Sequence, residues 1–168
     1  MTDSDRQEAE GRVAQLMQSV GYAIWQVQGL EDTLAAYIVV RLRESQGVGP
    51  DRGAELTAEL ARLELGKLIA QLRGAGVLPA EALQRLAKLR DERNWLVHRA
   101  WRENHGVIAD SARLAHLLQR LAALAEDALA LNKHMAAEVE ACVSSAGVTR
   151  EYIDREADRL RRSWESSD

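Results

Sequence analysis

The chain of 168 residues contains no phenylalanine, one cysteine, two prolines and few aromatic residues of any kind. The single cysteine, Cys142, excludes a fold held together by disulfide bonds. Few aromatic and β-branched residues argue against a β-sheet protein, because those side chains favour strands. The longest uninterrupted apolar run covers only Leu34 to Val40, far short of the roughly 20 residues that a membrane span needs. We therefore expect no membrane span, and the polar, acidic N-terminus predicts no signal peptide and a cytoplasmic location.

Helix-forming residues dominate what is present. Alanine and leucine contribute 27 and 23 residues, and 29% of the chain is charged. This composition predicts an all-α protein of one domain with a sizeable core. The net charge of −4 argues against indiscriminate binding of nucleic acid by the whole surface, although it leaves room for a local basic site.

Glycine and proline divide the chain into helical segments at about 4–45, 51–73, 79–104 and 111–146. Asp110 or Ser111 is expected to cap the fourth of these. Four long amphipathic helices with short connections predict an antiparallel four-helix bundle over residues 1–147. Residues 148–168 form an additional charged C-terminal helix or tail, which either docks on the bundle or is partly frayed.

The third helical segment breaks its own pattern at Arg93. This residue falls on the apolar stripe, four residues after Leu89 and three before Leu96, where a guanidinium needs a partner or a wet crevice. Asn94, His98 and Trp101 follow one another on the adjacent face. Arg93 and His98 are about 140° apart on a regular helix, so a flexible arginine, a kink or a symmetry-related copy is needed to bring them together.

Positive charge concentrates around this motif. Residues 85–102 carry six cations and two acids, in a chain whose net charge is negative. The cations are Arg85, Lys88, Arg90, Arg93, Arg99 and Arg102. In the first segment, Glu31 shares the inward face with Leu34, and a buried carboxylate needs a partner such as Arg93 or His98. An anion is expected to bind near the motif, with Glu31 as an orienting group.

The stretch Arg93-Asn-Trp-Leu-Val-His98 resembles the signature of HEPN domains, in which a polar residue often follows the arginine. The Leu30-Glu31 pair on a long first helix and the segment 65–69 also resemble the family, and the likeness covers about residues 10–145. It implies a HEPN-like helical bundle that forms a homodimer, with two motifs facing one cleft. Many members are metal-independent endoribonucleases of toxin–antitoxin or phage-defence systems. One branch carries a tyrosine that a partner enzyme modifies, and Ala100 stands at that position here.

Carried over to this chain, the resemblance makes His98 the general acid or base at the ribose 2′-hydroxyl and Arg93 the ligand of the scissile phosphate. Asn94 would position one of them, and Arg90, Arg99, Arg102 and Trp101 would bind substrate. The chemistry is self-consistent, because RNA supplies its own nucleophile and a guanidinium matches phosphate geometry. We expect RNA as substrate, no cofactor and no metal, and an antitoxin protein as a possible partner. His116 and His134 lie five turns apart, too distant to share a metal.

Structural interpretations of the same residues stay open. Arg93 alone can pair with Glu31, and His98 alone can bond a carbonyl near a helix end. Trp95 or Trp101 can stack on a base, yet for Trp25, Trp95 and Trp101 taken singly a core position is favoured. The alternative function is a non-catalytic dimeric helical module that binds RNA, a nucleotide or a protein through the same basic cleft.

Overall fold

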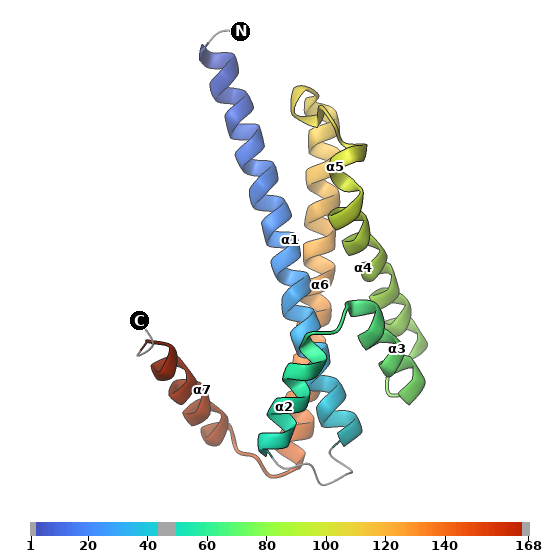
Figure 1. Ribbon diagram of the computed structural model, residues 1–168, viewed down its shortest axis with the longest axis vertical. Coiled ribbons are helices and arrows are strands. Elements are labelled where there is room, and N and C mark those ends of the chain that lie inside the picture. The colour runs from blue at the N-terminus through green and yellow to red at the C-terminus, as the bar shows by residue number, and fades with distance from the viewer. Residues whose placement is uncertain (1–2, 44–49, 166–168) are drawn as a thin grey trace.

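The computed structural model describes residues 3–43 and 50–165, and within these ranges it contains helices and no strand. The long helices are α1 (Asp3–Arg43), α4 (Ala80–His98) and α6 (Ser111–Ser145). Shorter ones are α2 (Pro50–Ala61), α3 (Leu65–Ala75), α5 (Ala100–Glu103) and the 3₁₀ turn η2 (Val107–Ala109). The last helix, α7 (Arg150–Glu165), stands apart from the others (Figure 1). The all-α prediction is confirmed.

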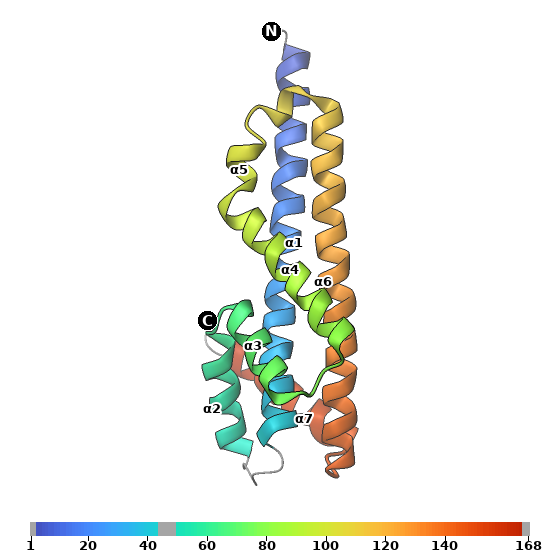
Figure 2. The same cartoon turned by 90° about the vertical axis from the view of Figure 1, so that its right-hand side faces the viewer.

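The core lies where α1, α4 and α6 meet, with α3 closing one end. Its most deeply buried side chains come from all four helices. They include Leu30, Leu34, Tyr37 and Ile38 of α1, Leu68 and Leu72 of α3, Leu86 and Leu89 of α4, and Leu121, Leu131 and Met135 of α6. Figure 2 shows α4 lying across α1 and α6. The leucine stripes that predicted these helices therefore face one shared core.

The helix expected over 51–73 is broken between Ala61 and Leu65. Leu56 and Leu65 are nine residues apart, which would put them roughly 180° apart on a continuous helix. Both are buried in the structure, and only a break with a change of direction allows this. Gly66, expected in mid-helix, therefore lies in the first turn of α3, where the side chain of Arg90 approaches it.

This extra reversal changes the topology. Thr33 bonds Asn132 and Arg41 contacts Cys142, so residue numbers in α1 and α6 rise together along the contact. The two helices thus run in the same direction, whereas an antiparallel four-helix bundle would oppose its first and last helices. The structure differs from the prediction here because hydrophobic burial at the α2–α3 turn outweighs the helix propensity of that segment.

The helix expected over 79–104 is also interrupted, at Arg99. The side chain of Trp95 reaches past the break and donates from Nε1 to Oε2 of Glu103 at 2.6 Å. In a continuous helix these residues would be separated by about 12 Å along the axis. The break therefore turns α5 back toward α4 and leaves His98 as the last residue of α4.

Asp110 caps α6, as the sequence predicts. Its carboxylate accepts hydrogen bonds from the backbone N–H groups of Ala112 and Arg113, at 3.1 and 3.0 Å. Replacing Asp110 with alanine should lower the free energy of unfolding by about 0.5–2 kcal/mol. Urea unfolding followed by circular dichroism measures this loss. Ser111→Ala removes a neighbouring exposed hydroxyl without touching the cap, and an equal loss in that variant would contradict the assignment.

Candidate functional site

Arg93 lies half-buried on α4 and interacts through its charge with Glu31 of α1. Its Nη1 also donates a long hydrogen bond of 3.4 Å to Oδ1 of Asn94. Glu31 is therefore the charge partner that a guanidinium on the apolar stripe requires. Arg93, Asn94 and Glu31 form one cluster, and the packing of α4 against α1 positions it.

Glu31 joins three helices. Burial raises the pKa of its carboxyl; the Arg93 charge lowers it, the Asp32 charge raises it and the backbone amide of Leu65 lowers it. Leu65 is the first residue of α3, whose preceding residue, Glu64, makes no side-chain cap. The Glu31 carboxylate thus lies near an uncapped helix N-terminus, where negative charge is favoured. Its Oε1 atom is buried and accepts no hydrogen bond from the described residues.

The raised pKa of Glu31 predicts a pH dependence of stability. A carboxyl group whose pKa is higher in the folded state binds its proton more tightly there, so its contribution to stability is present below the unfolded pKa and is lost as pH rises through the folded pKa. From about pH 4.5 upward, wild type should lose stability relative to Glu31→Gln. Urea unfolding of both proteins across this range tests the direction. A constant difference would contradict a raised pKa.

His98 is exposed at the end of α4. Its imidazole makes no hydrogen bond to any residue in ranges 3–43 and 50–165, whereas its backbone carbonyl accepts one from Nη2 of Arg102 at 2.9 Å. The interpretation that the side chain satisfies a nearby carbonyl is therefore wrong. The ring is free to meet solvent or a ligand.

Arg93 and His98 are not brought into contact within one copy. Arg93 is directed at α1, and the break at Arg99 comes after His98, so it does not change their relative position on α4. No hydrogen bond or ion pair joins them in the described chain. A complete site needs a ligand that spans both groups or a second copy that supplies one of them.

Two cations near the motif pair with acids, one of them distant in sequence. Arg85 pairs with Asp127 of α6, and Arg90 bonds its neighbour Asp91 at 2.9 and 2.7 Å. Lys88 and Arg99 make no ion pair within the described ranges. Asp127 offsets one cation of this stretch, but Asp91 already belongs to it and its other acid, Glu92, pairs with a further cation, Arg120, so the excess of positive charge remains.

A cluster of four side chains joins α4, α5 and α6, and no pattern in the sequence predicts it. Arg120 of α6 bonds Glu92 twice, at 2.7 and 3.1 Å, and its guanidinium stacks 3.3 Å from the ring centroid of Trp95. The same indole donates to Glu103 beyond the break. These contacts tie the end of α4, and with it His98, to α6. No spacing in the sequence relates Arg120 to the motif.

Trp25, Trp95 and Trp101 differ in burial. Trp95 is 5% exposed and belongs to the core, as favoured from the sequence. Trp101 and Trp25 are 76% and 73% exposed, so the core position expected for them is wrong. Trp101 follows the break at Arg99, which turns it outward beside an apolar groove of about 330 Å³. Trp25 points away from the side of α1 that carries Ala23 and Val27.

No three of the described His, Cys, Asp or Glu side chains gather as a metal site would require. Within the same residues, no helix has the length and apolar character needed to cross a membrane. Compared with known proteins, the chain matches no protein-family model, no curated protein and no solved structure.

Proposed function

We propose that the protein is a homodimeric, HEPN-type endoribonuclease that cleaves RNA without a metal. The observation that carries this proposal is the accessible, unbonded imidazole of His98 on the same helix as Arg93, whose guanidinium interacts through its charge with Glu31. One group can transfer a proton near neutral pH, and the other carries a permanent positive charge.

The proposed chemistry follows from these two side chains. His98 removes the proton of the ribose 2′-hydroxyl, or protonates the leaving 5′-oxygen, and the 2′-oxygen attacks the adjacent phosphorus. Arg93 binds the phosphate and stabilises the charge that develops on it. Asn94 bonds the guanidinium, and the charge of Glu31 attracts it. The products are a 2′,3′-cyclic phosphate and a 5′-hydroxyl.

A dimer is supported by the distribution of exposed apolar side chains. Of the seven large ones among the described residues, six lie on α1 between residues 13 and 25 or around the α4–α5 break. They are Val13, Met17, Tyr22, Trp25, Val97 and Trp101. Val13, Met17 and Trp101 line one apolar groove, and contiguous apolar surface of this kind marks interfaces. A second copy packed there would bring another Arg93 and His98 to the same cleft.

Cleavage of RNA in excess EDTA tests the proposal. Purified protein should convert single-stranded RNA to fragments that end in a 2′,3′-cyclic phosphate, identified by mass spectrometry. RNA whose 2′-hydroxyls are methylated is the matched control and should stay intact. Fragments with 5′-phosphates, or cleavage only when Mg²⁺ is added, would contradict the mechanism.

The second candidate is a non-catalytic module that binds a partner through the same face. The pairing of Arg85 and Arg90 with acids favours it, because it leaves fewer cations for a polynucleotide. In the same assay this candidate predicts intact RNA. Retained RNA binding that weakens steeply with salt would then identify a nucleic-acid module.

A further inference from the structure

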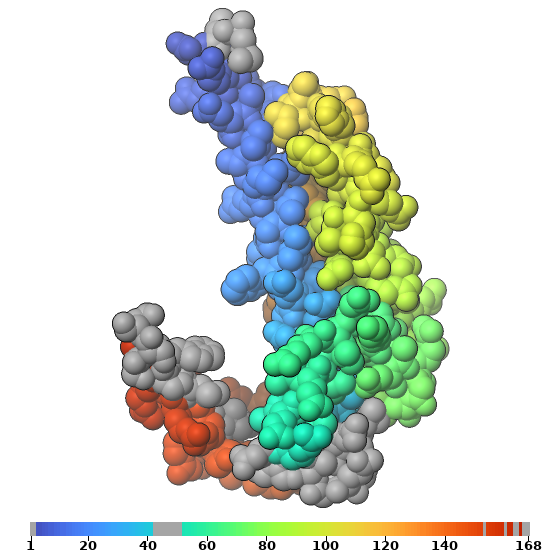
Figure 3. Space-filling model, in the orientation of Figure 1, coloured from blue at the N-terminus to red at the C-terminus, as the bar shows by residue number. Residues whose placement is uncertain are grey.

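Helix α7 lacks the packing that normally stabilises a helix of its length. It has 16 residues, and none of its described side chains belongs to the hydrophobic core. Figure 3 shows open space between α7 and the body of the molecule along α1. Helices this short are only marginally stable in water unless one face is buried against a neighbour. A stable α7 therefore requires another protein surface packed against one of its faces.

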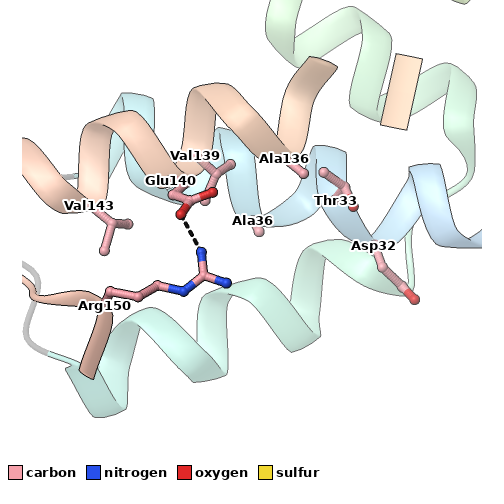
Figure 4. Close-up of a pocket in the computed structure, with 8 residues that line it drawn as sticks. All are labelled: Asp32, Thr33, Ala36, Ala136, Val139, Glu140, Val143 and Arg150. Carbon is pink, nitrogen blue, oxygen red and sulfur yellow. Dashed lines mark hydrogen bonds and ion pairs between the residues drawn. The ribbon is translucent and has the colours of Figure 1, made fainter. Parts of the chain in front are cut away.

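The direction of α7 is set at its first residue. Arg150 pairs with Glu140 of α6 (Figure 4). It also pairs with Asp154, one turn further along α7. Gly147, in the left-handed region at φ 86°, and a hydrogen bond from Val148 N to Val143 O fix the preceding turn. These contacts fix the first turn of α7 against the end of α6.

Helix α7 combines electrical neutrality with a repeated apolar pattern. It carries five arginines and five acidic residues, some of which pair within the helix, as Arg161 does with Asp158 at 3.0 Å. It is therefore not repelled by a body of negative net charge. In the sequence, apolar residues recur at positions 153, 157, 160 and 164, intervals that fall on one side of a helix.

The side of α1 that points away from the core has the matching features. Gly11, Gly21, Tyr22 and Trp25 fall within about 100° of one another around the helix, and we call them the outward face of α1. Tyr22 and Trp25 are 51% and 73% exposed. A Cβ atom added to Gly11 or Gly21 would meet nothing within 4 Å.

Those two glycines are unexplained within one copy. Each weakens an exposed helix by about 0.5–1 kcal/mol relative to alanine. Close approach of another helix is a common reason to find glycine inside a helix, and no atom of the described part of the chain lies within 4 Å of a Cβ added at either position. Two small residues beside two exposed aromatic rings form a surface on which a helix can pack.

We propose that α7 is an exchanged arm, which packs across the outward face of α1 of a second copy of the chain. The open space beside α1 in one copy then receives the partner, and the exchange is reciprocal about a two-fold axis. The length agrees, because α7 spans about 24 Å and the α1 segment from Gly11 to Trp25 spans about 21 Å. The inference rests on the homodimer of the proposed function and does not depend on catalysis.

Isotope-resolved cross-linking tests the arm in the full-length protein. A photoreactive benzoylphenylalanine replaces Ala157, on the apolar side of α7, and ¹⁴N and ¹⁵N preparations are mixed at low concentration and then concentrated. We expect cross-linked peptides that join a ¹⁴N residue 157 to a ¹⁵N segment of α1 between residues 11 and 32. The same probe at Arg155, on the opposite side of α7, should give few such links.

Links confined to one isotope would show that α7 folds onto its own copy, and no link to α1 would show that it packs elsewhere. Either result overturns the proposal. Neither result depends on RNA. Mixed-isotope links in a protein that does not cleave RNA would support the exchange of α7 and contradict the proposed endoribonuclease activity.

A charged substitution gives an independent measurement. Gly21→Arg should weaken the dimer about tenfold or more in sedimentation equilibrium, because it places a solvated cation in the buried contact. Gly74→Arg is the matched control, since Gly74 is also an exposed helical glycine with nothing within 4 Å. Equal dimer dissociation constants for the two variants would contradict the assignment of the outward face of α1.

Discussion

Replacing His98 with alanine is expected to slow metal-independent RNA cleavage by about 10²–10⁴-fold, the usual contribution of a general acid or base. Because the imidazole is exposed and unbonded, the same change should leave the urea unfolding curve almost unaltered. His116→Ala removes another exposed histidine, on α6, and should keep the full rate. Wild-type activity in His98→Ala, or an equal loss in His116→Ala, would reject the assignment.

Arg93→Ala should reduce cleavage as well, but with a second effect. It leaves the Glu31 carboxyl half-buried without its counter-charge, so some stability is lost together with activity. Arg93→Lys restores the charge without the planar fork and should recover the stability more fully than the rate. The double variant, Arg93→Ala with His98→Ala, should cleave RNA only slightly more slowly than either single variant, because the two groups act in one step.

Mixing the two inactive variants distinguishes a composite site from a site within one copy. If Arg93 of one copy acts with His98 of the other, a mixed dimer of Arg93→Ala and His98→Ala contains one intact site. Random exchange should then recover about a quarter of the wild-type activity, because half of the dimers are mixed and each has one of its two sites. If both groups come from one copy, no activity returns.

Trp95→Ala should lower the free energy of unfolding by about 3–5 kcal/mol, a typical cost for removing a buried aromatic ring. The loss includes the stack with Arg120 and the bond to Glu103. Trp95→Phe keeps most of the packing and should cost about 1.5–3 kcal/mol, because Glu103 loses the indole donor. Urea unfolding followed at 222 nm measures each variant.

Trp101 supplies the matched control for that series. It is the same residue type six positions later, yet it is 76% exposed. Trp101→Ala should therefore change stability by no more than about 0.5 kcal/mol. If Trp101 belongs to a dimer interface, the substitution should instead weaken the dimer. A large loss of monomer stability would contradict the outward orientation that the break at Arg99 gives to this side chain.

Local sequence signals were sufficient for the elements that depend on a few neighbouring residues. The leucine spacing in α1 and α6 and the position of Asp110 before α6 are properties of single helices, and the structure has both. The inward phase of Glu31 also followed from its spacing to Leu34. The sequence offers Arg93 and His98 as charge partners of Glu31. In the structure, Arg93 is the one whose charge acts on the Glu31 carboxyl.

Other features depended on which surfaces meet. The break between α2 and α3 allows Leu56 and Leu65 both to be buried, although they would lie about 180° apart on a continuous helix, and local helix propensity does not contain this requirement. Asp127 neutralises Arg85 from another helix, so charge counted along the chain differs from charge presented on the surface. Arg120 reaches Trp95 for the same reason.

The amino-acid order alone was enough to establish an all-helical chain, the faces its long helices bury and the motif from Arg93 to His98. Only the tertiary structure decided where two helices break, that α1 and α6 run in the same direction, and that Trp25 and Trp101 are exposed while Trp95 is not. The reason is physical. Periodicity specifies which side of a helix is apolar, but burial is a property of several helices together, and long-range packing outweighs local preference wherever the two conflict.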